Sequence, residues 1–166
     1  MKHDYKMEIA IINYGMNNLY SVQNACNNIG VKSIITDDHE KILKSKIAIL
    51  PGVGAYGNAI NSLKEKKLDT TIRNFIDSGK PFFGICLGMQ LLFEESEEFG
   101  STNGLNILKG KVIKFDTDIK KNLIVPHVGW NQISFNSENN HKNSVMKNNN
   151  NGEFMYFVHS FHVVPQ

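Results

Sequence analysis

Cys86 has the residue type and the setting most suited to chemistry in this chain. It lies in the run Lys80-Pro-Phe-Phe-Gly-Ile-Cys-Leu-Gly-Met-Gln90, with a glycine two residues away on each side. The apolar stretch 81–85 predicts a buried strand, and a helical pattern follows at Leu87, Leu91 and Leu92. A cysteine at such a sharp strand-to-helix turn is a nucleophile elbow, where helix N–H groups favour the thiolate and can stabilise an oxyanion. The alternative is a buried cysteine at an ordinary strand end, and the flanking glycines favour catalysis over it.

A second glycine cluster, Pro51-Gly-Val-Gly-Ala-Tyr-Gly57, follows a predicted strand at 47–50. It matches G-x-G-x-x-G formally, which is typical of dinucleotide binding. That fingerprint belongs after the first strand, however, and here a helix is expected where its ribose-binding acid would be sought. We favour a loop whose backbone N–H faces the Cys86 thiolate. Two neighbouring strand ends would then each supply an oxyanion donor, as acyl transfer requires.

The elements that position these loops alternate between strand and helix. Apolar runs predict strands at 8–13, 31–36, 47–50 and 81–85, and periodic patterns predict helices at 19–29, with Asn17 as its cap, and at 68–76. Gly30 and Gly79 are expected to close the two helices. Such alternation predicts an α/β fold with a mostly parallel sheet and helices on both faces. Ligands bind such sheets at the carboxyl ends of the strands, where Gly15, Gly52 and Cys86 fall.

The second half of the chain has a different character. Strands are predicted at 111–115, 130–135 and 154–158, joined by turns that favour antiparallel additions to the sheet. Residues 136–152 hold eight asparagines in seventeen positions and predict a surface loop. With 166 residues, the chain is expected to form a single domain, 1–166.

Composition excludes several classes of function. The net charge is +2 without a basic stripe, so no nucleic-acid partner is expected, and no apolar run is long enough to predict a membrane span. The two cysteines, Cys26 and Cys86, form no disulfide framework, which favours a cytoplasmic location. The six histidines lack metal-ligand spacing, so neither a metal nor a cofactor is predicted.

Five motifs together carry a resemblance to a known family. In chain order they are Ile12-Asn-Tyr-Gly-Met-Asn-Asn-Leu19, Leu50-Pro-Gly-Val-Gly54, Gly84-Ile-Cys-Leu-Gly-Met-Gln90, Pro126-His-Val-Gly-Trp-Asn131 and Tyr156-Phe-Val-His-Ser160. The chain resembles class I (triad-type) glutamine amidotransferases from about Met7 onward. Within that class it is most similar to the glutaminase subunits of imidazole glycerol phosphate synthases, which act in histidine biosynthesis.

The resemblance implies a role for each matching residue. Cys86 would attack the side-chain amide of glutamine and form a γ-glutamyl thioester, while the N–H groups of Val53 and Leu87 would form the oxyanion hole. The Pro-Gly-Val-Gly segment would reorient one peptide on activation. The residues expected to hold the glutamine are Gly52, Gly54 and Gln90, together with the backbone of His159, Ser160 and Phe161.

The resemblance also implies a partner. Ammonia would pass into a (β/α)8-barrel cyclase subunit of a heterodimer, which uses it to make imidazole glycerol phosphate and an aminoimidazole carboxamide ribotide (AICAR). Asn17, Asn18 and Trp130 match segments that lie toward that interface, although a lone tryptophan is as often a core residue.

The family's general base lies in a later F-x-H-P-E motif, and no such motif occurs before Gln166. We therefore expect the sequence to be incomplete at its C-terminal end, and the 166-residue chain to lack substantial glutaminase activity. His127, expected in a turn, is a poor substitute, as are His159 and His162. Three alternatives stay open: a paralogue that feeds ammonia to surface-sugar biosynthesis, a truncated non-catalytic subunit that only binds its partner, and, less favoured, a cysteine hydrolase on a related sheet.

Overall fold

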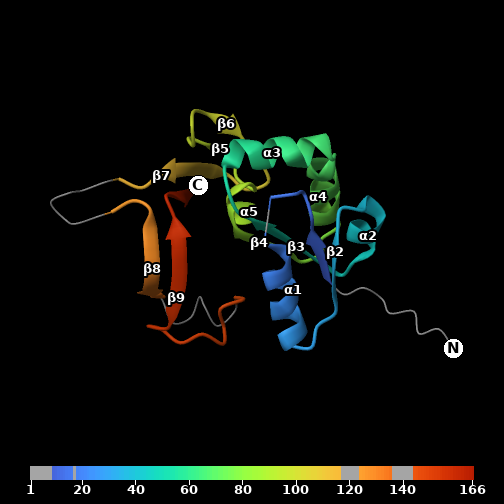
Figure 1. Cartoon of the computed structure of the whole chain (residues 1–166), viewed down its shortest axis with the longest axis horizontal. Helices are drawn as coiled ribbons and strands as arrows, with labels where there is room; N and C mark the ends of the chain where they lie inside the picture. The colour runs from blue at the N-terminus through green and yellow to red at the C-terminus, as the bar shows by residue number, and fades with distance from the viewer. Residues whose placement is uncertain (1–8, 17, 117–123, 136–143) are drawn as a thin grey trace. The chain divides into compact units, whose positions relative to one another are not determined.

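The structure is a computed structural model that describes residues 9–16, 18–116, 124–135 and 144–166 (Figure 1). By its internal contacts the chain divides into two compact units. The first comprises residues 1–113 with 163–166, and the second residues 114–162. Each unit is described by itself below, and a single domain over 1–166 stays a prediction.

A four-stranded parallel sheet forms the centre of the first unit, in the order β2-β1-β3-β4. Its strands are β1 (Ile9–Ile12), β2 (Ser33–Thr36), β3 (Ile47–Gly52) and β4 (Phe82–Cys86). Every residue of β1 is buried, as expected for a parallel strand covered on both faces. The predicted parallel sheet is confirmed.

The helices of this unit are α1 (Leu19–Asn28), α2 (His39–Lys44), α3 (Tyr56–Glu65), α4 (Leu68–Asp77) and α5 (Leu87–Gln90). The two predicted helices are α1 and α4, and Gly30 and Gly79 follow them with φ of +74° each, as expected for closing glycines. Asn17, the predicted cap of α1, lies outside the described residues. The N-cap position belongs to Asn18, whose side chain makes no capping bond.

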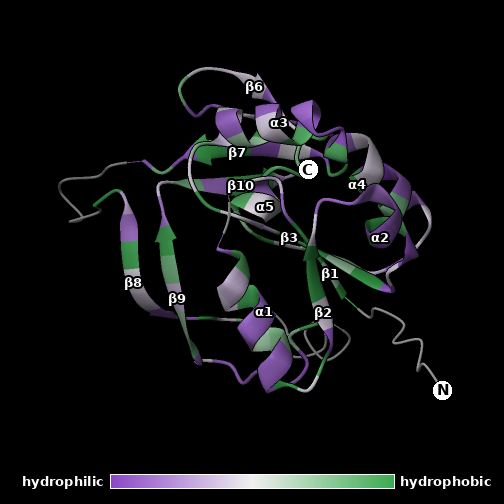
Figure 2. Cartoon of the chain, turned by 45° about the vertical axis from the view of Figure 1, so that its right-hand side comes forward, coloured by the Kyte–Doolittle hydropathy of each residue, from purple (hydrophilic) through white to green (hydrophobic). Residues whose placement is uncertain are grey.

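Helices cover both faces of the sheet (Figure 1). On one face Cys26 of α1 packs against Ile9, Ile11 and Ile49. The α3–α4 pair lies on the opposite side, as Figures 1 and 2 both show, and most of its apolar residues are buried. The carboxyl edge of the sheet is left for the loops after β1, β3 and β4.

A second, smaller sheet has the order β10-β7-β5-β6. Its strands are β5 (Glu95–Ser96), β6 (Thr102–Asn103), β7 (Gly110–Lys114) and β10 (Phe161–Pro165). The prediction at 111–115 corresponds to β7. The sequence did not predict β5 and β6, because two residues carry no alternation.

The second unit contains an antiparallel hairpin of β8 (His127–Gln132) and β9 (Phe154–His159), in which Trp130 faces Tyr156. The strand predicted at 130–135 was wrong at both ends, because β8 begins at His127 and ends at Gln132, so His127 lies in a strand rather than a turn. Of the asparagine-rich segment, 136–143 lies outside the described residues, and 144–152 forms neither helix nor strand.

Candidate active site

Cys86 lies at the junction of β4 and α5, as the sequence predicted. Its backbone has φ 53° and ψ −118°, a left-handed conformation that strains a residue with a side chain, and Cys86 is exposed. The following helix is shorter than its leucine pattern indicated. It ends at Gln90, and the N–H of Leu92 turns back to the Met89 carbonyl (3.1 Å), which tightens the chain beyond it. The structure therefore has the strained turn of a nucleophile elbow.

Glycines let three backbone segments meet at this turn. Gly52 is the register partner of Cys86, so the end of β3 lies directly beside the elbow. A Cβ on Gly52 would come within 2.6 Å of the Gly88 nitrogen, and one on Gly88 would overlap the Leu50 carbonyl. Both glycines are therefore required for close approach, since no real Cβ tolerates such contacts.

The two expected oxyanion donors differ in whether their N–H groups are already hydrogen-bonded. Leu87 begins α5, so its N–H has no acceptor within the helix. The Val53 N–H instead donates to the Met16 carbonyl oxygen (3.2 Å), in the loop after β1. An N–H bonded in this way does not also point at an oxyanion, because it carries a single proton. The structure thus shows an arrangement in which the Val53 N–H is bonded to Met16 and does not serve as the expected donor.

Tyr14 is a residue of this edge that sequence reasoning named only within the first of the five motifs. Its side chain is completely buried, and its hydroxyl oxygen is 2.6 Å from the place of a Cβ on Gly52. Burial, and to a smaller degree the charge of Cys86, raise the pKa of Tyr14 well above its ordinary value. The signal in the sequence was a large aromatic residue between a buried strand and a glycine, at the edge where the site was expected.

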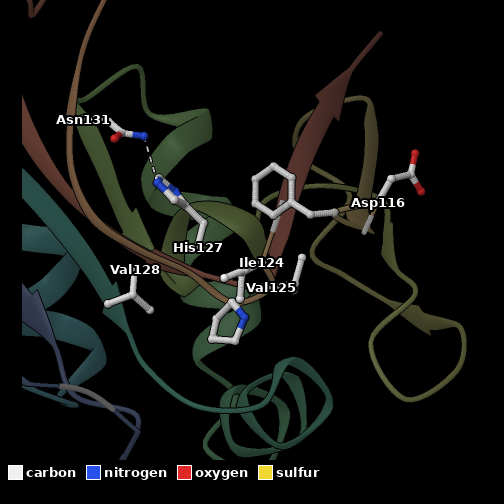
Figure 3. A pocket seen from close by; sticks show the side chains of 8 residues that line it. Asp116, Ile124, Val125, His127, Val128 and Asn131 are labelled. Carbon is white, nitrogen blue, oxygen red and sulfur yellow. Dashed lines mark hydrogen bonds between the residues drawn. The ribbon is translucent and has the colours of Figure 1, made fainter. Parts of the chain in front are cut away.

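The predicted glutamine-binding segment His159–Phe161 lies in the second unit, where hydrogen bonds fix it. The Asn131 Nδ2 lies 2.8 Å from His127 Nε2, and His127 Nδ1 lies 3.3 Å from His159 Nε2 (Figure 3 draws the first bond). His159 Nδ1 lies 2.9 Å from the Phe161 carbonyl oxygen. A carbonyl only accepts, so His159 Nδ1 carries the proton, and with neutral rings every bond in the chain runs from Asn131 toward Phe161.

A hollow of about 620 Å³ lies in the same unit (Figure 3). It is lined by Phe115, Asp116, Ile124, Val125, Pro126, His127, Val128 and Asn131. None of these residues carries a thiol or hydroxyl nucleophile, so we do not assign the chemistry to this hollow.

One face of the β8–β9 hairpin is apolar and exposed. Trp130 is 66% exposed and packs edge-on against Tyr156, with ring centroids 5.5 Å apart. Val128, Val158 and Phe154 extend the same face. In this structure Trp130 is therefore a surface residue and not part of a core.

Other features are reported for the described residues alone. Within them, no group of three or more His, Cys, Asp and Glu side chains could hold a metal ion, and no imidazole is hydrogen-bonded to Cys86. The same residues include no helix with the length and apolar character needed to cross a bilayer.

The strained turn at Cys86, on the carboxyl edge of a parallel sheet, points to the α/β enzymes that use a thiol for acyl transfer. The chain belongs to the class I glutamine amidotransferase family. The family model described as "Glutamine amidotransferase class-I" matches residues 10–166.

Similar proteins agree with this family. The chain is 44% identical over 161 residues to "Imidazole glycerol phosphate synthase subunit HisH" of Aquifex aeolicus, covering 96% of this chain and 74% of that protein. The HisH subunit of Sulfurimonas denitrificans is 46% identical over 157 residues, covering 94% and 73%. Among solved structures, a glutamine amidotransferase (14% identity, TM-score 0.63, 90% and 70% covered) and PurLQS from Thermotoga maritima (21%, 0.63, 97% and 70%) share the fold.

Proposed function

We propose that the chain is the glutaminase subunit of an imidazole glycerol phosphate synthase. It hydrolyses glutamine to glutamate and ammonia, and the ammonia is used by a (β/α)8-barrel cyclase partner to make imidazole glycerol phosphate and AICAR. The observation that carries the proposal is the strained Cys86 turn beside the end of β3. Relatives with 43–46% identity that bear the HisH name support the choice of pathway over the surface-sugar alternative. A cytoplasmic location stays a prediction.

The chemistry begins with a bond between the Cys86 sulfur and the side-chain carbonyl carbon of glutamine. The carbonyl oxygen becomes an oxyanion, which the N–H groups of Leu87 and Val53 stabilise. Collapse of this intermediate breaks the carbon–nitrogen bond, and the nitrogen leaves as ammonia after gaining a proton. Water then cleaves the γ-glutamyl thioester, which releases glutamate and restores the thiol. The acid–base role belongs to the histidine that the family resemblance implies.

We assign substrate contacts to residues of each unit. In the first unit these are Gly52, at the end of β3, Gly54 in the loop that follows, and Gln90, which ends α5. The segment His159–Phe161 would bind the substrate through its main chain. The hydrogen bonds that run from Asn131 to the Phe161 carbonyl support this role, because they hold the segment in one conformation.

Activity should depend on the cyclase partner. In the arrangement observed, the Val53 N–H is bonded to Met16, so only the Leu87 donor is available. Partner binding would turn the Gly52–Val53 peptide over and supply the second donor. The exposed apolar face around Trp130 and Tyr156 supports the predicted interface, to which we also assign Asn18.

The test is a glutaminase assay of the full-length protein with and without its cyclase partner. We expect glutamate to form at rates typical of enzymes only in the complex, and Cys86→Ser to remove that activity while the complex still forms. Wild-type complex that produces glutamate no faster than Cys86→Ser would refute the proposed function. Ammonia transfer is measured separately, as cyclase turnover with glutamine in place of ammonium salts.

A further inference from the structure

The Tyr14 hydroxyl is a buried polar group that the observed arrangement leaves unused. The side chain is 0% exposed, and among the described residues its hydroxyl makes no hydrogen bond. Burying a hydroxyl without a partner is unfavourable, so native proteins rarely do so without a functional reason. The position of this hydroxyl, beside Gly52 at the end of β3, indicates a functional reason.

The hydroxyl lies against the main chain at the end of β3. It is as close to the place of a Cβ on Gly52 as the Gly88 nitrogen is, at 2.6 Å. The Ser62 hydroxyl donates to the Tyr14 carbonyl, which anchors the main chain that carries the ring, and Gly15 follows with φ +100°. The buried ring therefore places its hydroxyl next to Gly52.

The loop after β1 contacts the Gly52–Val53 peptide in two ways. Met16 accepts from the Val53 N–H, and Tyr14 places its hydroxyl beside Gly52. When the peptide turns over, its N–H and C=O exchange directions. The Gly52 carbonyl then points toward the loop after β1 and toward the Met16 oxygen, and two acceptors would face each other without a proton between them.

We propose that Tyr14 is a positioning residue whose hydroxyl donates to the Gly52 carbonyl when the Gly52–Val53 peptide is turned toward the oxyanion. The inference rests on the proposed function, since it deepens the account of how the same site is activated. The hydroxyl has no partner in the resting arrangement and gains one in the active arrangement. It therefore favours the active arrangement without touching glutamine.

The raised pKa of Tyr14 is consistent with a donor role, because the hydroxyl keeps its proton across the physiological range. The alternative role for the same hydroxyl is an action on the Cys86 thiol, whose charge contributes to the raised pKa. The experiment below separates the two roles.

The test uses Tyr14→Phe in the full-length protein with its cyclase partner, and Tyr56→Phe as a matched control. Tyr56 is also 0% exposed and also has a hydroxyl without a partner among the described residues, but that hydroxyl lies beside Gly104 and not beside Gly52. We expect Tyr14→Phe to lower the partner-stimulated kcat about 3- to 10-fold with little change in KM, as for the loss of one hydrogen bond in a single state. The unfolding temperature should stay the same or rise, because the substitution removes an unsatisfied group from the resting state.

The outcomes are distinct. The proposal is supported if kcat falls in Tyr14→Phe, stays at the wild-type value in Tyr56→Phe, and neither variant loses thermal stability. It is overturned if Tyr14→Phe turns over like the wild type, or loses kcat only together with its unfolding temperature. It is also overturned if Tyr14→Phe shifts the pH profile of Cys86 alkylation, because the hydroxyl would then act on the thiol. A wild-type complex without glutaminase activity would instead refute the proposed function.

Discussion

Replacing Val53 by proline tests the oxyanion assignment most directly. Proline has no N–H, so Val53→Pro removes the donor itself and leaves Cys86 and Leu87 in place. The Val53 side chain is 51% exposed, so the exchange removes little buried apolar contact. Gly52, which precedes it, adopts the extended conformations that a following proline requires. We expect the partner-stimulated glutaminase kcat to fall about 10²–10³-fold, the usual effect of losing one oxyanion donor.

The same change should affect stability far less. It removes the hydrogen bond from the Val53 N–H to the Met16 carbonyl, which contributes about 0.5–1.5 kcal/mol net. Proline offsets about 0.4–1 kcal/mol of this loss by restricting the unfolded chain. The free energy of unfolding should therefore change by less than about 1 kcal/mol, against the roughly 2.7–4 kcal/mol lost from the transition state. The variant should therefore lose activity while it keeps nearly the same stability.

The assay is steady-state glutamine hydrolysis by the full-length protein in complex with its cyclase partner. Val53→Ala is the matched variant: it shortens the same side chain but keeps the N–H, so we expect it to lose far less activity than Val53→Pro. Alkylation of Cys86 and partner affinity are measured in both variants to show that the site and the interface persist. Turnover by Val53→Pro within about threefold of Val53→Ala would refute the reasoning, since a missing donor costs about 10²-fold or more.

Three further predictions follow from the described residues. A glutamine-mimicking affinity label should modify the exposed Cys86 and spare the buried Cys26, and peptide mass mapping that finds label on Cys26 alone would contradict the nucleophile assignment. Gly88→Ala should prevent folding or lower the unfolding temperature by more than about 10 °C, because the new Cβ would overlap the Leu50 carbonyl. Gly57→Ala is the matched variant: Gly57 lies in α3, and its new Cβ would meet only Thr102 Oγ1, at 3.8 Å. This variant should raise the unfolding temperature by about 1–4 °C. Burial, and to a smaller degree Glu95, raise the pKa of Tyr56 to about 12. Because the pKa of Tyr56 in the folded protein exceeds the ordinary value of about 10, the stability that this residue contributes below pH 10 is lost as the pH rises toward 12. Tyr56→Phe should therefore move the midpoint of alkaline unfolding to higher pH.

The central sheet and its elbow could be predicted because their signals are local. Apolar runs such as Ile9–Ile12 end at turn residues, and a cysteine between two glycines marks the turn after β4. The helix α2 was missed because six residues carry too little periodicity, although Asp38 caps it by accepting from the Lys41 N–H. The start of β8 was misplaced because His127 was expected in a turn, whereas in the hairpin it pairs with His159.

The directions of the polar groups in the site could not be predicted from local patterns. A motif names Val53 as a donor, but the direction of its N–H depends on Met16, a residue distant in sequence. The same holds for Tyr14, whose hydroxyl reaches Gly52 only because β1 and β3 are neighbours in the sheet. Sequence patterns therefore located the groups, and tertiary contacts determined which of them are available.

The two proposed oxyanion donors differ in how firmly their N–H groups are held, and this difference decides where regulation can act. Moving the Leu87 N–H would require the elbow to separate from β3, where Gly88 is packed directly on the Leu50 carbonyl. Moving the Val53 N–H requires the loss of one hydrogen bond, worth about 0.5–1.5 kcal/mol. A full shift of a two-state equilibrium from 1:99 to 99:1 needs about 5.5 kcal/mol of differential binding, which a protein–protein interface can supply. A partner can therefore switch the Val53 donor while the Leu87 donor stays fixed, so activation by the cyclase should act through β3 and the loop after β1.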